Sequence, residues 1–194
     1  MPEHLRERID RLGRETVEIV PYNPAWPQQF LDERARLLER FPDLMRRVEH
    51  VGSTAVPGLS AKPIVDMLIE VTSLDETVTH IVPALEADGY EYLWRPTSGD
   101  DIPPFYAWFI KRNREGQRTH HIHMVERDFP QWEALLFRDH LIANPSTARQ
   151  YVELKQRLAA EYRNDREAYT DGKGEFVRRM TDIARAARSS RAEG

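Results

Sequence analysis

The sequence predicts an α+β fold: a mixed β-sheet core of about five strands with flanking helices, followed by a helical C-terminal part. Two features support this prediction. Between positions 48 and 126, short runs of β-branched and apolar residues are separated by turn residues, which is typical of strands. After position 128, apolar residues recur at the three- and four-residue spacing of amphipathic helices. We therefore expect one sheet, then about three helices.

The first forty residues predict a charged helix, a short strand and a longer helix. In the first segment the apolar residues stand four and three positions apart, which indicates a helix within 1–16. Val17–Val20 has the composition of a short strand. Pro27 fits the first turn of a helix that runs through Phe41, because proline at that position gives up no hydrogen bond.

The middle of the chain predicts the sheet. The strand Ile64–Val71 is nearly continuous in apolar residues, so we expect it to be covered on both faces. Ser73 with Glu76 forms a capping box for a helix that Pro83 kinks or splits. The remaining predicted strands are Val48–Val51, Tyr90–Trp94, Phe105–Lys111 and Thr119–Glu126.

The last third predicts three helices. Asp128 and Pro130 begin the first, Asn144 caps the second, and the third covers residues 175–188. The expected organisation is a charged helix in 1–16, an α/β core in 17–127, helices packed on that core in 128–188, and a flexible tail in 189–194.

Composition excludes several classes of protein. The chain has 194 residues, of which 40% are hydrophobic and 31% charged, and this balance suits a water-facing protein with a core. The absence of cysteine excludes disulfide scaffolds, thiolate metal sites and cysteine nucleophiles. A net charge of −4 with interleaved signs does not indicate a nucleic-acid partner.

The sequence contains no apolar run long enough to span a membrane. Its first residues are charged and lack the apolar region of a signal peptide. We therefore expect a cytoplasmic protein with no membrane partner. Nothing in the sequence indicates an oligomeric state.

The most informative segment is residues 49–71, EHVGSTAVPGLSAKPIVDMLIEV. Gly52 lets the backbone approach a ligand closely, and the two hydroxyl residues after it add hydrogen-bond donors. Lys62 can meet a phosphate as a point charge. Asp66 lies inside an apolar strand, where a carboxylate is costly unless it is paired or holds a metal ion. The segment is not a Walker A loop, because its prolines prevent the helix that such a loop opens into.

A Gly-Ser turn followed by an acidic strand residue resembles the nucleotidyltransferase superfamily, with its polymerase-β-like fold. The string EHVGSTAVPGLSAKPIVDM resembles more closely the signature of the GrpB family. PYNPAWPQQF, HHIHMVE and FRDHL fit the same family, so that the resemblance covers about residues 17–183. It implies a nucleotidyltransferase-like fold and a nucleotide-handling role without an established reaction. Members of this family are also found fused to dephospho-CoA kinases.

The chain departs from the wider superfamily at its carboxylates. A typical member has two acidic residues flanking one hydrophobic residue on the strand, whereas here Leu68 stands at the second position. The next acid on the face of Asp66 is Glu70, about 13 Å along the strand, too far to share one ion. His121 and His123 share a face of a later predicted strand and can act there as metal ligand or general base.

Our first hypothesis is an enzyme that acts on a nucleoside triphosphate with Mg²⁺ or Mn²⁺ and transfers a nucleotidyl group to an unknown acceptor. The turn would cradle the phosphates, and the lysine would neutralise charge on the phosphoryl oxygens. The predicted nucleotide-binding residues are Gly52, Ser53, Thr54 and Lys62; the predicted metal ligands are Asp66, His121 and His123; and the predicted catalytic residues are Asp66, Lys62 and His123.

Three alternatives remain open from the sequence. The same residues can form a non-catalytic module that binds a nucleotide or a coenzyme A precursor, or a scaffold with a vestigial pocket. His120, His121 and His123 can instead form a transition-metal site. The residues also have structural interpretations. Asp66 can pair with Lys62, Arg118 or a backbone amide, and His50 and Glu49 can orient the turn. Tyr169 and Lys173 can be helix surface or packing, or can close the site.

Overall fold

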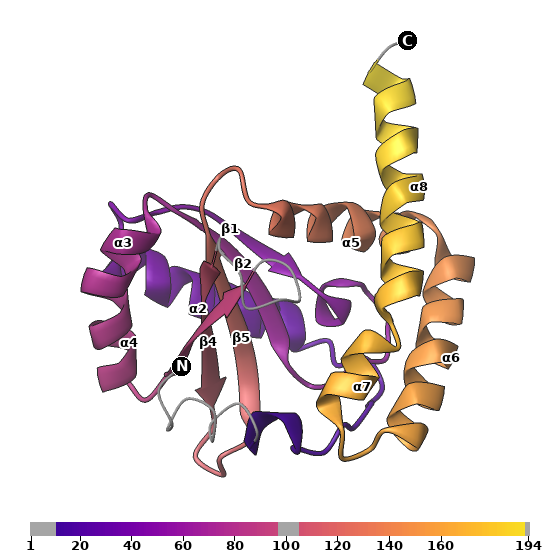
Figure 1. The fold of residues 1–194 in the computed structure, drawn as a ribbon, viewed down its shortest axis with the longest axis horizontal. Helices are drawn as coiled ribbons and strands as arrows, with labels where there is room; N and C mark the ends of the chain where they lie inside the picture. The colour runs from indigo at the N-terminus through magenta and orange to yellow at the C-terminus, as the bar shows by residue number, and fades with distance from the viewer. Residues whose placement is uncertain (1–10, 97–104, 193–194) are drawn as a thin grey trace. The chain divides into compact units, whose positions relative to one another are not determined.

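The computed structural model describes residues 11–96 and 105–192 (Figure 1). They form two compact units. The sheet unit comprises Asn23–Ala55 and the described parts of Pro63–Trp132. The helical unit comprises the described parts of Met1–Tyr22 and Glu133–Gly194, together with Val56–Lys62. These boundaries differ from the expected ones, because segments before and inside the sheet region group with the C-terminal helices.

The sheet unit contains a five-stranded mixed sheet, so the expected α+β class is confirmed. Strands β2 and β5 run parallel, and the other neighbouring pairs are antiparallel. In spatial order the strands are β1 (Met45–Val51), β2 (Val65–Val71), β5 (Arg118–Val125), β4 (Phe105–Arg112) and β3 (Glu91–Pro96).

The two faces of the sheet differ. On one, which we call the helix-covered face, His50, Met67, Ile122 and Phe109 follow one another across β1, β2, β5 and β4. Helix α2 (Trp26–Arg40) packs on this face, where Phe30 stacks on His50. The opposite face, which we call the site face, carries the alternate residues of the same strands. The residues on it include Asp66, Leu68, His121, His123 and Trp108.

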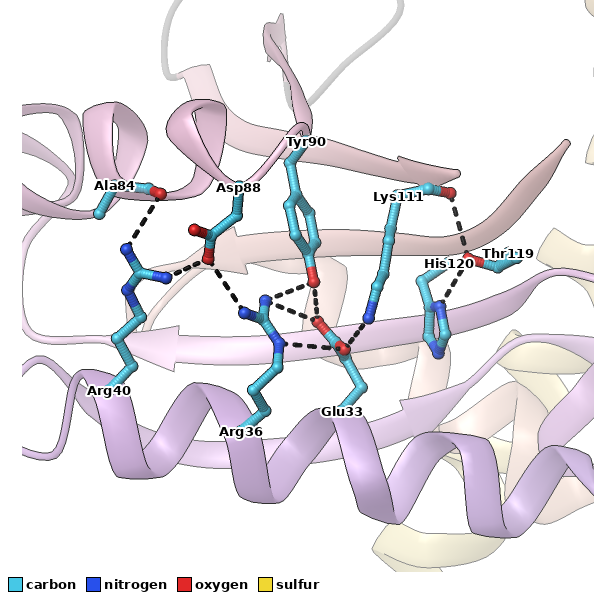
Figure 2. Close-up of polar contacts among 9 residues, drawn as sticks. All are labelled: Glu33, Arg36, Arg40, Ala84, Asp88, Tyr90, Lys111, Thr119 and His120. Carbon is cyan, nitrogen blue, oxygen red and sulfur yellow. Dashed lines mark hydrogen bonds and ion pairs between the residues drawn. The ribbon is translucent and has the colours of Figure 1, made fainter. Parts of the chain in front are cut away.

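A buried carboxylate fastens α2 to the sheet. Glu33 is 3% exposed and accepts hydrogen bonds from Lys111 of β4, Tyr90 and Arg36 (Figure 2). Figure 2 also shows Arg36 reaching Asp88, its Nη1 3.1 Å from the carboxylate. Burial and the neighbouring Glu33 raise the pKa of Tyr90, so its hydroxyl remains a donor. The network thus joins α2 to two segments far away in the sequence.

The predicted helix after residue 73 is present and divided. The Ser73 side chain caps α3 (Leu74–Glu76) by accepting from two backbone N–H groups. A π-helical turn, Thr77–Ile81, then leads into α4 (Val82–Ala87), with Pro83 in its first turn, as expected for a split helix. The Glu76 carboxylate accepts from the Thr72 hydroxyl, so only the serine half of the capping box forms.

The helical unit includes α5 (Ala134–Ala143), α6 (Pro145–Glu161), α7 (Arg166–Asp171) and α8 (Gly174–Ala192), and residues 11–13 are also helical. Its core includes Val56, Leu59, Leu141 and Tyr151. None of the helices in the described ranges combines the length and apolarity that a membrane crossing needs.

Four details of the sequence prediction are wrong. Val17–Val20 is not a strand, because Val20 forms only an isolated bridge, to Ala61. Helix α7, which the Asp165 side chain caps, was not predicted. Asn144 does not cap α6, since its amide donates to the carbonyl of His140. Residues 189–192 continue α8, where the hydroxyls of two serines bond carbonyls one turn back. Most of the predicted N-terminal helix, the tip of the loop after β3 and residues 193–194 lie outside the described residues.

Candidate functional site

The predicted turn lies directly against the predicted carboxylate. Strand β1 ends at Val51, and Gly52 follows with a φ of +70°. A Cβ atom on Gly52 would stand 2.4 Å from Oδ2 of Asp66, closer than any real contact. Glycine is therefore required twice at this position, by its backbone conformation and by the approach of Asp66. A short 3₁₀ turn, Ser53–Ala55, continues from it.

Thr54 anchors this turn from the inside. Its side chain is almost fully buried, and its hydroxyl donates to the carbonyl of Ile64 at 3.4 Å. Because that bond uses the hydroxyl proton, the contact with His50 Nε2 at 3.0 Å has the histidine as donor. Thr54 and His50 thus hold the turn in place. The Thr54 hydroxyl, a predicted nucleotide contact, is thus engaged within the protein.

Asp66 is paired with His121. The two residues are neighbours across β2 and β5, and His121 Nδ1 lies 3.1 Å from Asp66 Oδ1. On the other side of the ring, Nε2 lies 3.4 Å from a guanidinium nitrogen of Arg118. An arginine can only donate, so Nε2 accepts and the proton sits on Nδ1, which donates to the carboxylate. The Asp66 side chain is 31% exposed, which leaves it accessible to a ligand.

His123 lies one step along the same face, opposite Leu68 and Trp108. Its Nδ1 is 3.3 Å from the hydroxyl of Tyr106, and its ring stacks on Trp108. The edge of Trp108 also meets His121, with ring centroids 5.2 Å apart. No motif in the sequence singles out Tyr106 or Trp108, although strand alternation places both on one face of the predicted strand Phe105–Lys111.

The third histidine points away. His120 pairs with Val65 and Lys111 and is 7% exposed, and burial lowers its pKa. It lies on the helix-covered face, near the Glu33 network in Figure 2. A transition-metal site that uses all three histidines is therefore incompatible with the structure.

The donor set does not suit a preformed metal centre. Within residues 11–96 and 105–192, no group of three or more His, Asp or Glu side chains is placed to hold a metal ion. His121 is engaged with Asp66 and Arg118, and Glu49, which lies opposite Leu68, is paired with Arg47. A two-ion site does not fit these residues. One Mg²⁺ held by a single carboxylate and by the phosphates of a ligand does fit, since Mg²⁺ commonly binds in this way.

Lys62 belongs to the helical unit. Its Nζ lies 5.2 Å from the centre of the Tyr169 ring. The structure therefore brings together the predicted residues of the turn and of strands β2 and β5 in one unit. It places the predicted lysine beside Tyr169 and Lys173 in the other.

A separate cavity of about 560 Å³ lies at the far end of β2 in the sheet unit. Acidic and basic side chains both line it, and none of the predicted site residues does. The turn, Asp66 and His121 form instead a surface on the site face. The lining of the cavity includes Arg46, Glu70, Glu126, Arg127 and Asp128.

The close approach of turn and carboxylate can be tested with Gly52→Ala. We expect the substitution to lower the free energy of unfolding by about 1–3 kcal/mol for the left-handed backbone and to displace Asp66 from His121. Urea unfolding measures the first effect, and the ¹⁵N shifts of the His121 ring measure the second. Gly116→Ala is the matched control, because Gly116 has a φ of +79° and open space beside it. Gly116→Ala should share the loss of stability and leave the His121 shifts unchanged, so His121 shifts that move equally in both variants would contradict the contact of Gly52 with Asp66.

The chain is similar to several known proteins. Residues 16–182 match the family described as GrpB protein. The UPF0157 protein YqkA of Bacillus subtilis is 37% identical over 176 residues, which cover 90% of this chain and 49% of YqkA. The chain thus spans about half the length of that relative. The crystal structure of the conserved protein GrpB from Enterococcus faecalis superimposes with a TM-score of 0.74 at 32% identity, covering 86% of this chain and 96% of that one.

One relative is an enzyme by name. A dephospho-CoA kinase of Mycolicibacterium paratuberculosis is 30% identical over 189 residues, which cover 87% of this chain and 46% of the kinase. The matching region is therefore one part of that longer protein.

Proposed function

The chain belongs to the GrpB family, and from the geometry of its sheet unit we propose that this unit binds the phosphates of a nucleoside triphosphate together with one divalent cation. The observation that carries the proposal is the contact between Gly52 and Asp66, because it sets the Gly-Ser turn directly beside a carboxylate. Triphosphate and cation need these two groups as neighbours.

Each residue has a specific task in this proposal. The backbone N–H groups of the turn and the hydroxyl of Ser53 donate to phosphate oxygens. Asp66 would hold Mg²⁺ or Mn²⁺, which as a Lewis acid polarises a phosphoryl oxygen. His121 donates to Asp66 and thereby fixes the direction of the carboxylate. His123, half-buried and backed by the buried ring of Trp108, offers a ring surface beside it on which a base can stack.

Nucleotidyl transfer to an acceptor would require a general base, and His123 is the candidate on this face. Binding without transfer is the second candidate function. It is favoured by Leu68, which stands where a second carboxylate would be needed for two-ion chemistry. The partial match to a dephospho-CoA kinase makes coenzyme A precursors suitable ligands to include in its test.

We expect Asp66→Asn to abolish metal-dependent nucleotide binding while the protein remains folded. The measurement is a thermal-shift titration with nucleoside triphosphates, diphosphates and coenzyme A precursors, with and without Mg²⁺ or Mn²⁺. Ligand at about 100 times its dissociation constant adds about 2.7 kcal/mol, a shift of several degrees. Glu70→Gln is the matched control, because it neutralises a carboxylate farther along the same face of β2.

The outcomes separate the candidates. A metal-dependent shift that Asp66→Asn removes and Glu70→Gln keeps supports the proposal, and formation of a nucleotidyl product then supports the enzyme. A shift that ignores both metal and Asp66 supports the binding module and overturns the cation site. No shift with any ligand contradicts both.

A further inference from the structure

Lysine is rare in this chain and unevenly placed. The sequence has four lysines among its 28 basic residues, and Lys62, Lys155 and Lys173 all belong to the helical unit. Each of the three lies against a tyrosine ring. Nζ of Lys173 and Nζ of Lys62 lie 4.3 Å and 5.2 Å from the centre of the Tyr169 ring, and Nζ of Lys155 lies 4.8 Å from that of Tyr151.

The segment that carries Lys62 is fixed in position. Val56 and Leu59 belong to the core of the helical unit, and Ala61 bridges to Val20. From α6, the ammonium group of Lys155 donates to the carbonyl of Ser60. Lys62 therefore extends from a backbone held by the core, by the bridge and by a buried ammonium group.

Lys173 is brought to the same neighbourhood by the turn between α7 and α8. Gly172 packs so closely on α6 that a Cβ there would stand 2.6 Å from a methyl carbon of Leu158. Tyr169, one turn earlier, is 1% exposed and presents its ring to both Lys62 and Lys173. Cation–π attraction thus holds two ammonium groups around one buried ring.

This arrangement concentrates positive charge where water is scarce. Lys155 is 2% exposed, and burial together with the charge of Lys173 lowers its pKa to about 7. The half-buried Lys62 and Lys173 remain within reach of a ligand. An anion bound beside Lys62 and Lys173 would be attracted by the charge of both ammonium groups.

We propose that Lys62, Lys155 and Lys173 form a polyphosphate-binding site in the helical unit. Compact ammonium groups suit the many oxygens of a polyphosphate, which point in several directions, whereas arginine suits planar, bidentate pairing. Lys62 and Lys173 contact the anion. Lys155 holds the backbone near Lys62 through its hydrogen bond to the Ser60 carbonyl, and its positive charge adds to the attraction for the anion. The identity of the ligand as a nucleotide rests on the proposed function, but the lysine site itself can be tested with pyrophosphate alone.

The first test is calorimetric titration of the full chain with pyrophosphate in the presence of a chelator, so that no cation takes part. We expect binding, and a dissociation constant raised about tenfold or more in Lys173→Gln and in Lys62→Gln. Arg179→Gln is the matched control, since it removes one positive charge that lies over another ring of the same unit, 5.8 Å from the centre of Phe176. It should change the dissociation constant less than about twofold.

The second test uses selective ¹³C labelling of lysine, which yields four Cε signals for the whole chain. We expect pyrophosphate to shift the three signals of the cluster and to leave that of Lys111 unchanged, because Lys111 belongs to the sheet unit. Lysine-to-arginine variants assign the signals.

Two results would overturn the lysine site. One is the absence of pyrophosphate binding, or an equal loss of affinity in Lys173→Gln, Lys62→Gln and the control Arg179→Gln. The other is loss of metal-free binding in Asp66→Asn, which would assign the anion to the sheet unit. Retained pyrophosphate binding in Asp66→Asn supports the lysine site even where the triphosphate and cation proposal fails.

Discussion

Replacing Glu33 with alanine should lower the free energy of unfolding by about 3–5 kcal/mol, the cost of breaking a buried ionic network by removing one partner. Glu33 is 3% exposed and is the common acceptor for Lys111, Tyr90 and Arg36 (Figure 2). Without the Glu33 carboxylate, these three donors lose the acceptor that they share. Because they come from β4, from the residue before β3 and from α2 itself, the substitution loosens the helix from the sheet.

The same variant has a pH signature. Burial alone would raise the pKa of Glu33, but the hydrogen bonds from Lys111, Tyr90 and Arg36 outweigh it and hold the pKa below its usual 4.5. A carboxylate with a depressed folded pKa adds stability above 4.5 and loses it as the pH falls through the folded value. The difference between wild type and Glu33→Ala should therefore shrink in acid.

Urea unfolding across the acid range measures both effects. Glu39→Ala is the matched control, because Glu39 is an exposed acid on the same helix. A loss as small as that of the control would show that Glu33 is not the anchor of α2. A large loss that stays constant in acid would contradict its depressed pKa.

The sequence could reveal this helix but not its anchor. Pro27 and the apolar spacing predict α2, since both signals lie within the helix itself. Glu33 and Arg36 appear there only as an ordinary pair on a helix surface. Tyr90 and Lys111 lie 57 and 78 residues away, and only the pairing of β3 with β4 brings them to Glu33.

For the candidate site too, the sequence predicts features within one strand but not contacts between strands. Strand alternation predicts that His121 and His123 share a face, and the register confirms it. Alternation cannot say which residue of a neighbouring strand lies opposite, so the sequence did not show that His121 pairs with Asp66. The contact of Gly52 with Asp66 likewise depends on the register of β1 with β2, where Asp66 stands opposite Val51.

Tyr169 and Lys173 show a further limit of sequence reasoning. The sequence leaves them as helix surface, packing or a closing element of the site, whereas in the structure Tyr169 is 1% exposed and both Lys62 and Lys173 lie against its ring. Two signals were available in the sequence. One is the use of lysine at four positions in a chain otherwise rich in arginine, and the other is Gly172, which permits close packing beside Lys173.

The largest pH effect on stability should come from Lys155. Its folded pKa of about 7 lies below the ordinary 10.5, so between these values the unfolded chain binds one proton more than the folded chain. Stability should therefore rise with pH across this window, by about 1.4 kcal/mol per pH unit. Below pH 7 Lys155 is protonated in both the folded and the unfolded state, and burying its charge then lowers the free energy of unfolding by the full amount, about 5 kcal/mol.

The measurement compares wild type with Lys155→Met in urea across that window. The free energy of unfolding of wild type should climb relative to the variant, whereas Arg157→Met, an exposed change on the same helix, should give no such divergence. Parallel curves for wild type and Lys155→Met would show that the buried amine titrates normally. Saturating pyrophosphate should hold Lys155 protonated in the folded state and so flatten the climb. Because the Glu33 network lies in the other unit, this flattening would report on the lysine cluster and not on the stability of the sheet.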